Sequence, residues 1–215
     1  MRPSVSVAQW KRPLASSGQR FLFWSAALFV VAALAYVFLD LPVVRHFEPL
    51  QGSQFRATVS RLSRIGDSKW YLGAGAVLYV VLRWRYRILA SRAAYLFASV
   101  AVTGITATAL KYVVGRPRPR TFLVEGSSAF QWFDSDWRFW SMPSGHATTI
   151  AAVAMAFSIM YPRFRVPILI AGFLVAFGRV VTLDHYVSDV LAGLWLGIAG
   201  ALALSKCFSI HGSDT

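Results

Sequence analysis

The sequence predicts an all-α fold: one integral-membrane domain, residues 1–215, built as a bundle of about six transmembrane helices. Of the 215 residues, 56% are hydrophobic and only 14% are charged, so a soluble domain of this size would have more apolar surface than its core could bury. Apolar runs also recur along the whole chain rather than at one end. This recurrence favours a polytopic membrane protein over a soluble domain with a single anchor.

Six apolar segments are the expected spans. A helix needs roughly 20 mainly apolar residues to cross a bilayer, and fewer where its ends are amphipathic. The segments that satisfy this condition are residues 21–39, 70–82, 93–114, 147–161, 166–183 and 187–204. The second is the shortest. The last four, with their connections, form the motif-bearing core of the domain at about 93–205.

Basic residues near the first two spans indicate the orientation. Before the first span stand Arg2, Lys11, Arg12 and Arg20, and after the second stand Arg83, Arg85, Arg87 and Arg92. Because Lys and Arg concentrate in short cytoplasmic connections, we expect residues 1–20 to be cytoplasmic, although the two sides have equal totals of Lys and Arg. Residues 33–35, Ala-Leu-Ala, resemble a signal-peptidase site, but the apolar run continues past them, so we expect an uncleaved helix.

The chain is strongly basic, with a formal net charge of +13. In a soluble protein this charge would indicate a nucleic-acid partner. No basic stripe follows a soluble helix here, and arginines at the ends of membrane helices contact lipid headgroups. We therefore expect membrane lipids, and no nucleic acid, as partners. The single cysteine, Cys207, excludes an internal disulfide and a cysteine-based metal cluster.

Residues with catalytic potential fall at three places along the chain. They lie at the end of the third span, at the start of the fourth, and at the junction of the fifth and sixth. With an even number of spans, both termini share one side of the membrane and these three places share the other. A single site on that face is therefore expected.

The first place is residues 111–119, Lys-Tyr-Val-Val-Gly-Arg-Pro-Arg-Pro. Lys111 lies near a helix end, and Arg118 lies in a turn that the prolines stiffen. Two cations presented in this way suit an anionic ligand. Taken alone, the segment fits equally well a stop signal whose cations reach the lipid headgroups.

The second place is residues 143–146, Pro-Ser-Gly-His, directly before an apolar run. Proline and serine favour a first helical turn, and glycine permits close approach of a ligand. The free amides and the positive end of the helix dipole then form an anion site. His146 could donate a proton to a leaving oxygen, whereas the simpler alternative is a capping turn with an incidental histidine.

The third place contains Arg179, His185 and Asp189. On a helix, His185 and Asp189 would share a face because they are four residues apart. A carboxylate that holds one imidazole nitrogen leaves the other nitrogen with its lone pair, as nucleophilic attack requires. The alternative is a histidine at a helix start with an acidic neighbour.

Together, the three places resemble the signature of the type 2 phosphatidic acid phosphatase family, which are membrane lipid phosphatases of the vanadium haloperoxidase-like superfamily. In that signature six residues separate a lysine from Arg-Pro; Pro-Ser-Gly-His follows; then five residues separate an arginine from a histidine, and three more separate the histidine from an aspartate. The same types and spacings occur at Lys111, Arg118, residues 143–146, Arg179, His185 and Asp189. The family usually has serine before the last arginine, where this chain has Gly178, so any hydrogen bond from that serine is missing.

The resemblance implies a role for each matched residue. His185 would be the nucleophile that becomes phosphorylated, Asp189 its orienting partner, and His146 the acid for the leaving group. The phosphate would be bound by Lys111, Arg118, Ser144, Gly145 and Arg179. Phosphoryl transfer depends mainly on positioning and charge stabilisation, so we expect no metal ion or other cofactor, and the spans lack the carboxylate cluster of a two-metal phosphatase.

The expected activity is hydrolysis of a lipid phosphate monoester or diphosphate. Phosphatidate, phosphatidylglycerol phosphate, a polyprenyl diphosphate and a lipid A phosphate all remain open as substrates. A lipid phosphotransferase of the same superfamily is one alternative. A non-catalytic anion-binding transporter or scaffold is another, although binding alone needs no nucleophile and acid. A vanadate-dependent haloperoxidase shares the pocket by resemblance but is soluble, which the apolar spans oppose.

Compact size and short loops indicate a bacterial inner-membrane enzyme. The topology and the family resemblance imply that its site faces the periplasm or the exterior. The oligomeric state is left open. Arg116 and Arg120 fall outside the matched positions, so we expect headgroup contact there, with substrate contact as the alternative.

The connection after the third span contains Phe122, Phe130, Trp132, Phe133, Trp137, Phe139 and Trp140. Such rings favour the membrane interface, where they would help to admit a lipid headgroup or simply anchor the loop.

Overall fold

The computed structural model describes residues 17–210, and all of their regular elements are helices. The long helices are α1 (Ser17–Phe38), α4 (Ser68–Leu82), α5 (Arg87–Val114), α7 (Gly145–Met160), α8 (Arg165–Val181) and α9 (Val187–Leu204). They coincide one to one with the six expected spans, so the prediction of an all-α membrane bundle is confirmed. Residues 1–16, most of the segment expected in the cytoplasm, lie outside the described residues.

The helices differ in length and in how fully they are covered. Four stretches are long and apolar enough to cross a membrane, namely Gly18–Phe38, Arg87–Glu125, Pro162–Val181 and Val187–Cys207. α4 has 15 residues and α7 has 16, which corresponds to roughly 22–24 Å at 1.5 Å per residue. α7 is buried over most of its length, so its neighbours are other helices rather than lipid.

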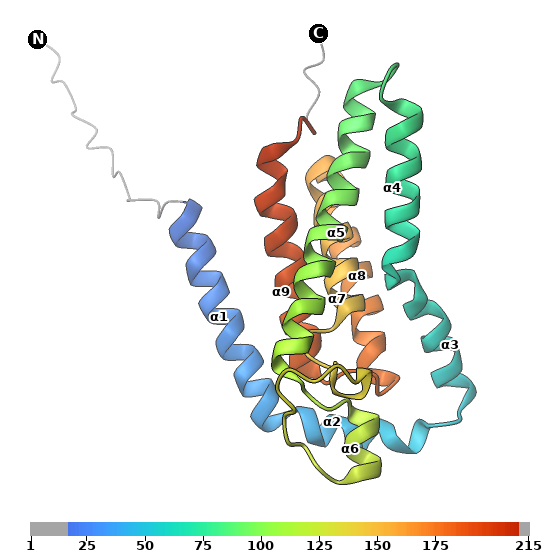
Figure 1. Ribbon diagram of the computed structural model, residues 1–215, viewed down its shortest axis with the longest axis vertical. Coiled ribbons are helices and arrows are strands. Elements are labelled where there is room, and N and C mark those ends of the chain that lie inside the picture. Colours follow the sequence, from blue (N-terminus) through green and yellow to red (C-terminus); the bar gives the residue numbers. More distant parts are fainter. Residues whose placement is uncertain (1–16, 211–215) are drawn as a thin grey trace, which may run out of the picture.

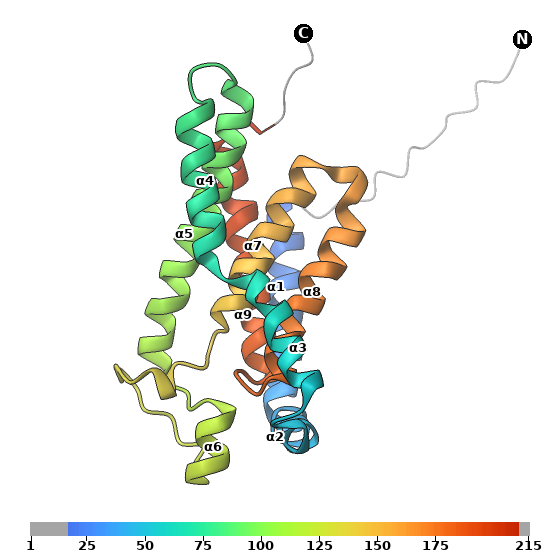
Figure 2. The same cartoon turned by 90° about the vertical axis from the view of Figure 1, so that its right-hand side faces the viewer.

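α7 forms the centre of the bundle (Figure 1). α5, α8 and α9 all pack against it, while α4 pairs with α5 and α1 packs against α9. Figure 2 shows α4 and α5 on one side of this centre and α8 on the other. Large apolar side chains such as Phe29 and Ile105 are exposed on the outer surfaces, as expected where lipid rather than water covers a helix.

Two glycines of α9 allow it to approach α7 closely. A Cβ atom on Gly197 would lie 2.3 Å from the carbonyl oxygen of Thr148, and one on Gly193 would lie 2.5 Å from that of Ser144. No larger residue fits at these distances without moving a backbone. Small residues at such contacts are typical of helix packing in membranes, and here they fix the first turn of α7 against α9.

The connection between the first two spans has more structure than the sequence predicts. It contains α2 (Asp40–Phe47), α3 (Gln54–Ser63) and two 3-10 turns, Glu48–Leu50 and Arg64–Gly66. α3 packs against α8, and Arg64–Gly66 packs against α7. These segments are too short and polar to cross a membrane, so hydropathy gave no sign of them. A further short helix, α6 (Pro119–Glu125), follows α5.

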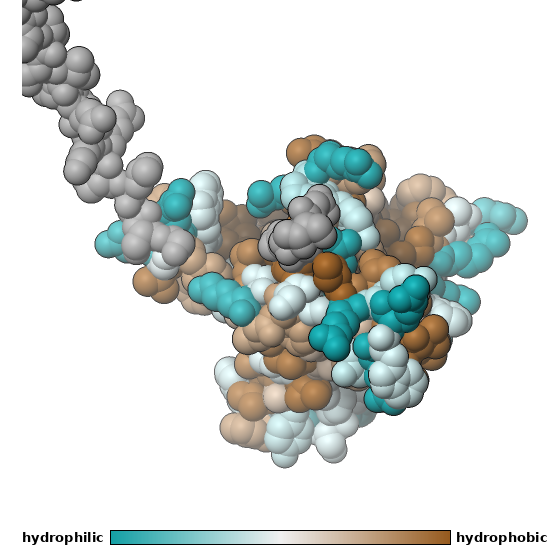
Figure 3. All heavy atoms as spheres, turned by 90° about the horizontal axis from the view of Figure 1, so that it is seen from above, coloured by the Kyte–Doolittle hydropathy of each residue, from teal (hydrophilic) through white to brown (hydrophobic). Residues whose placement is uncertain are grey.

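The two ends of the bundle differ in what they carry. α2 and α6 cover one end, and α1 begins and α9 ends toward the other (Figure 1). The turn between α4 and α5, which contains Arg83 and Arg85, also lies at this second end. Seen from there, hydrophilic side chains are spread among apolar ones (Figure 3), as expected of a surface where charged side chains meet lipid headgroups.

Candidate active site

The three places with catalytic potential meet at the end of the bundle that α2 and α6 cover. Lys111 lies in the last turn of α5, His146 in the first turn of α7, and His185 between α8 and α9. A hydrogen bond from the amide of Ser144 to the carbonyl oxygen of Asp189, 3.0 Å long, joins the second place directly to the third. The structure therefore assembles one site on one face of the bundle.

His185 is held with one nitrogen engaged and the other free. Its side chain is nearly enclosed, with 2% of the residue exposed, and its Nδ1 lies 2.8 Å from the carbonyl oxygen of Ser141. Because a carbonyl can only accept, Nδ1 carries the proton and Nε2 keeps its lone pair. Burial lowers the pKa of His185 to about 3, and the nearby cations Lys111 and Arg118 act in the same direction. The imidazole is therefore neutral at physiological pH, as a nucleophile must be.

Asp189 acts on His185 mainly indirectly, through other groups that it binds. Its Oδ2 lies 3.8 Å from His185 Nδ1, whereas it accepts shorter hydrogen bonds from the Ser141 hydroxyl at 2.5 Å and the Tyr186 amide at 2.9 Å. The spacing of four residues predicted a direct pair on one helical face. α9 begins only at Val187, so His185 precedes the helix and its Nδ1 is directed to Ser141 instead.

Arg116 is a buried partner of Asp189 rather than a headgroup contact. Only 4% of the residue is exposed, and its guanidinium binds Asp189 Oδ1 at 2.6 Å and Asp40 Oδ2 at 2.8 Å. It also stacks 4.0 Å from the ring centroid of Tyr186. Asp40 in turn accepts a 2.5 Å hydrogen bond from the hydroxyl of Ser188. Arg116 thus ties α2 to the first turn of α9 beneath the site.

Two of the three expected phosphate-binding cations are oriented by backbone carbonyls. Lys111 Nζ donates to the carbonyl oxygen of Trp140 at 2.8 Å, and Arg118 Nε donates to that of Trp137 at 3.2 Å. Arg118 also lies over the Trp137 ring, 5.4 Å from its centroid. Each cation retains further N–H donors for an anion.

The third cation, Arg179, is fixed by a carboxylate. Its NH2 lies 2.9 Å from Asp184 Oδ2, and its NH1 donates to the Ser63 hydroxyl at 3.3 Å. Its buried Nε has no hydrogen-bond partner, which leaves one N–H available for a phosphate oxygen. Asp184 also binds Arg120 at 2.6 Å. Although burial alone raises the pKa of a carboxyl, these two arginines hold the pKa of Asp184 below its ordinary value.

The start of α7 has the form expected of an anion site. Ser144 is the N-cap, and its hydroxyl accepts a hydrogen bond from the Ala147 amide at 3.4 Å. Gly145 is the first residue of the helix. The first amide groups of a helix have no partner within it, and the helix dipole is positive there. A phosphate oxygen at this position would be stabilised by both effects.

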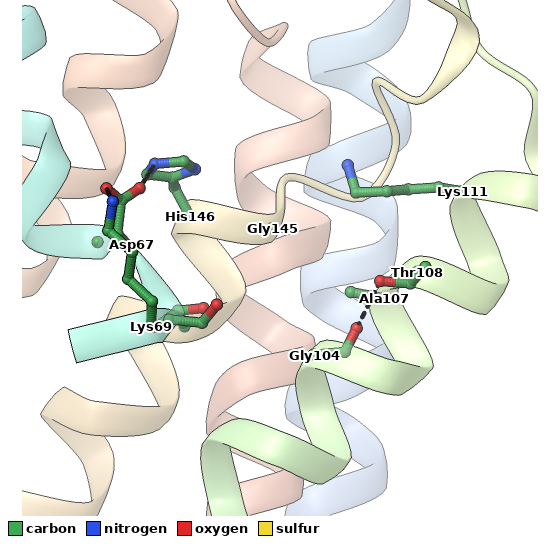
Figure 4. A pocket seen from close by; sticks show the side chains of 11 residues that line it. Asp67, Lys69, Gly104, Ala107, Thr108, Lys111, Gly145 and His146 are labelled. Atoms are coloured by element: carbon green, nitrogen blue, oxygen red, sulfur yellow. Dashed lines mark hydrogen bonds and ion pairs between the residues drawn. The ribbon is translucent and has the colours of Figure 1, made fainter. Parts of the chain in front are cut away.

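A cavity of about 300 Å³ lies beside this helix start. Its walls include Lys111, Gly145 and His146, together with Asp67 and Lys69 from the start of α4 (Figure 4). His146 Nε2 lies 2.5 Å from Asp67 Oδ1. Of the residues expected at the site, His185, Arg118 and Arg179 do not line this cavity. His146 and Lys111 are therefore accessible from this cavity, while His185 is covered.

Comparison with known proteins identifies the family. Residues 92–212, more than half of the chain, match the PAP2 superfamily. The chain belongs to the PAP2 superfamily. The lipid A 1-phosphatase of Rhizobium etli is 31% identical over 205 residues, which cover 86% of this chain and 87% of that protein. The lipid A 1-phosphatase of Rhizobium johnstonii is 31% identical over 218 residues, 93% of this chain and 87% of that protein. No solved structure matches.

Membership of the PAP2 superfamily confirms the resemblance drawn from the motifs and makes this chain a membrane lipid phosphatase. Within residues 17–210, no three His, Cys, Asp or Glu side chains are grouped so that they could hold a metal ion. The candidate site contains the cations Lys111, Arg118 and Arg179 together with the buried His185.

Several residues of this PAP2 site escaped the sequence analysis. Asp67 and Ser141 belong to no motif. Each lies far along the chain from the histidine that it contacts, His146 for Asp67 and His185 for Ser141. Asp40 offered a faint signal, because it is a lone acid between two leucines at the end of the first span. Asp184 adjoins His185 at a position that the family signature leaves open, so the motif gives no sign of its role.

The aromatic rings after α5 lie partly on the surface. Trp132, Phe133 and Trp137 are exposed, while Phe130 packs between the rings of Tyr36 and Trp132. Such placement suits the interface of a membrane. Whether these rings admit a headgroup or only anchor the loop stays a prediction.

Proposed function

We propose that this PAP2 phosphatase removes the 1-phosphate of a lipid A-type lipid through a phosphohistidine intermediate on His185. The observation that carries the mechanism is the geometry of that residue. It is buried and neutral, its Nδ1 donates to the Ser141 carbonyl, and its Nε2 keeps a lone pair among cations. A histidine that only filled space would need neither the cations nor a fixed tautomer.

The first step transfers the phosphoryl group to the enzyme. Nε2 of His185 attacks phosphorus, the bond from phosphorus to the lipid oxygen breaks, and its electron pair stays with that oxygen. His146 supplies the proton that neutralises it. Lys111, Arg118 and Arg179 stabilise the charge on the three other phosphoryl oxygens, which is the main source of acceleration in phosphoryl transfer.

The second step returns the enzyme to its starting state. Water attacks the phosphohistidine, His146 accepts the proton of that water, and the phosphorus–nitrogen bond breaks with its electron pair returning to Nε2. Inorganic phosphate leaves. His146 is thus the acid in the first step and the base in the second.

The lipid A-type substrate is favoured by the two relatives, which are both named for the 1-phosphate of lipid A and which this chain matches along most of its length. We place such a phosphatase in the inner membrane of a bacterium. With basic connections at the opposite end of the bundle, the site would face the periplasm.

The proposal is tested by measuring phosphate release in detergent micelles from lipid A, phosphatidate, phosphatidylglycerol phosphate and a polyprenyl diphosphate. We expect lipid A to be the best substrate, with loss of its 1-phosphate by mass spectrometry. His185→Ala should abolish turnover, and His146→Ala should slow it by about 100-fold or more. Glu48→Gln, which removes an exposed carboxylate in the 3-10 turn after α2, is the matched control.

Wild-type turnover by His185→Ala would refute the nucleophile. Preference for another lipid would refute the substrate but leave the mechanism standing. If the enzyme becomes phosphorylated, releases no inorganic phosphate and passes its phosphoryl group to a second lipid, the chain is a phosphotransferase instead.

A further inference from the structure

The acid of the proposed reaction has a carboxylate partner outside every motif. Asp67 Oδ1 lies 2.5 Å from His146 Nε2, and Figure 4 shows the two side chains facing each other. We propose that Asp67 is a positioning residue that binds His146 through Nε2 and favours the doubly protonated ring, so that Nδ1 delivers the proton to the leaving oxygen. This inference rests on the proposed function, because it assigns a helper to His146 in that reaction.

The backbone around Asp67 fixes this contact. Asp67 is the N-cap of α4 and follows the 3-10 turn Arg64–Gly66, which packs against α7. A Cβ atom on Gly66 would lie 3.3 Å from both Cβ and Cδ2 of His146. The turn therefore packs closely against His146, and Asp67, the next residue, lies beside the imidazole.

The contact decides which nitrogen faces the substrate. An ionised carboxylate can only accept, so Nε2 of His146 carries a proton. In Figure 4 the second ring nitrogen lies on the side of the ring that faces Lys111. Both residues line the cavity of about 300 Å³ at the start of α7. Nδ1 is therefore the nitrogen placed toward the site where the phosphate would bind.

The charges around His146 explain why a carboxylate is needed. Burial and the charge of Arg179 from α8 lower the pKa of His146 below its ordinary value, while Asp67 and Asp184 act against that shift. Two more cations, Lys69 beside Asp67 and Lys111 across the cavity, add positive charge. Without Asp67 the ring would hold its second proton still less well, and a neutral ring with its proton on Nε2 has none on Nδ1 to give.

The proton balance follows from this arrangement. As the bond between phosphorus and the lipid oxygen breaks, the Nδ1 proton moves to that oxygen and His146 becomes neutral. Asp67 stays ionised and keeps the Nε2 proton. When water attacks the phosphohistidine, Nδ1 takes up one proton of that water and the imidazolium forms again.

The test compares two substrates that differ in their need for a proton. The alkoxide of lipid A leaves poorly without protonation, whereas the phenolate of p-nitrophenyl phosphate leaves unaided. Phosphorylation of the enzyme is followed in a single turnover with each substrate, in wild type, Asp67→Asn, Asp67→Ala and the Glu48→Gln control. We expect both Asp67 variants to slow the reaction of lipid A by about 10- to 100-fold and that of p-nitrophenyl phosphate by less than about threefold.

The pH profile gives a second readout that a purely structural role would not move. Without the carboxylate, the imidazolium of His146 loses its proton more readily. As the pH rises, the rate with lipid A should therefore begin to fall at a lower pH in Asp67→Asn than in wild type. Lowering the pH should restore the rate of the variant. Glu48→Gln should keep the wild-type profile.

Other outcomes would overturn the inference. Equal slowing of both substrates would mean that Asp67 only maintains the fold, and no slowing would mean that it has no role. In either case loss of activity in His185→Ala would leave the proposed function intact. If His185→Ala also formed product at the wild-type rate, the proposed function would fail and the role of Asp67 would fail with it.

Discussion

His185, the proposed nucleophile, is oriented by a chain of contacts rather than by one neighbour. Asp189 accepts from the hydroxyl of Ser141, and the carbonyl of the same Ser141 accepts from His185. Arg116 neutralises Asp189 from below and also binds Asp40. The side chains of Arg116, Asp40 and Asp189 are almost completely enclosed. Such a buried cluster is stable only while every charge keeps its partner.

We therefore expect the replacement of Arg116 to cause a large loss of stability. Arg116→Met would leave Asp40 and Asp189 buried without their cation, which costs about 3–5 kcal/mol when one partner of a buried pair is removed. Thermal unfolding in detergent measures the loss. Arg120→Gln removes an arginine whose side chain is 48% exposed and which pairs with Asp184. This substitution should change stability by less than about 1 kcal/mol. Equal effects of the two substitutions would show that Arg116 is no more than a surface cation.

At the scale of helices, the site depends on the distance between α7 and α9. α7 presents His146 and the helix amides, while the segment leading into α9 presents His185 and Asp189. Gly193 and Gly197 set that distance, because their Cα atoms face the backbone of the first turns of α7. The addition of one methyl group at this contact should lower both the stability of the protein and its rate of turnover.

Gly197→Ala tests this dependence. The added Cβ would collide with the Thr148 carbonyl and the Ala152 amide, at 2.3 and 2.7 Å, so the helices must separate. Overpacking of this kind costs about 1–3 kcal/mol, and the shifted helices should also lower kcat. Gly73→Ala in α4, where nothing lies within 4 Å, is the matched control and should be neutral or slightly stabilising. Unfolding temperature and turnover are measured for both, and an unchanged Gly197→Ala protein would contradict the packing argument.

At the scale of the whole molecule, the even number of spans separates the site from the chain ends. Cys207 lies in the 3-10 turn after α9, at the end of the bundle away from α6 (Figure 1). It is exposed, and it is the chain's single cysteine. The natural protein therefore carries a reporter at the end that we expect to be cytoplasmic.

Labelling of that cysteine tests the orientation. In spheroplasts of a bacterial host, a membrane-impermeant maleimide should leave Cys207 unlabelled until the cells are lysed. In a Cys207→Ser background, Val124→Cys, on the exposed face of α6, should be labelled without lysis. The positive-inside distribution of short connections is the physical basis. The reverse pattern would place the site in the cytoplasm.

The sequence by itself determined the fold class, the six helices and the identity of the phosphatase family. Hydropathy reports the spans because the bilayer requires a minimum apolar length. The spacing of Lys111, Arg118, His146, Arg179 and His185 reports the family because each residue lies close to a helix end, where local sequence fixes its place. The short helices α2, α3 and α6 were missed, since they neither span the membrane nor repeat a motif.

Only the tertiary structure decided which side chains meet. It directed His185 to the Ser141 carbonyl, placed Arg116 between Asp40 and Asp189, and brought Asp67 to His146. Each of these contacts joins residues from different helices or loops, and hydropathy and motif spacing describe one segment at a time. Which buried donor meets which acceptor is settled when the helices pack, because every enclosed charge must then find a partner.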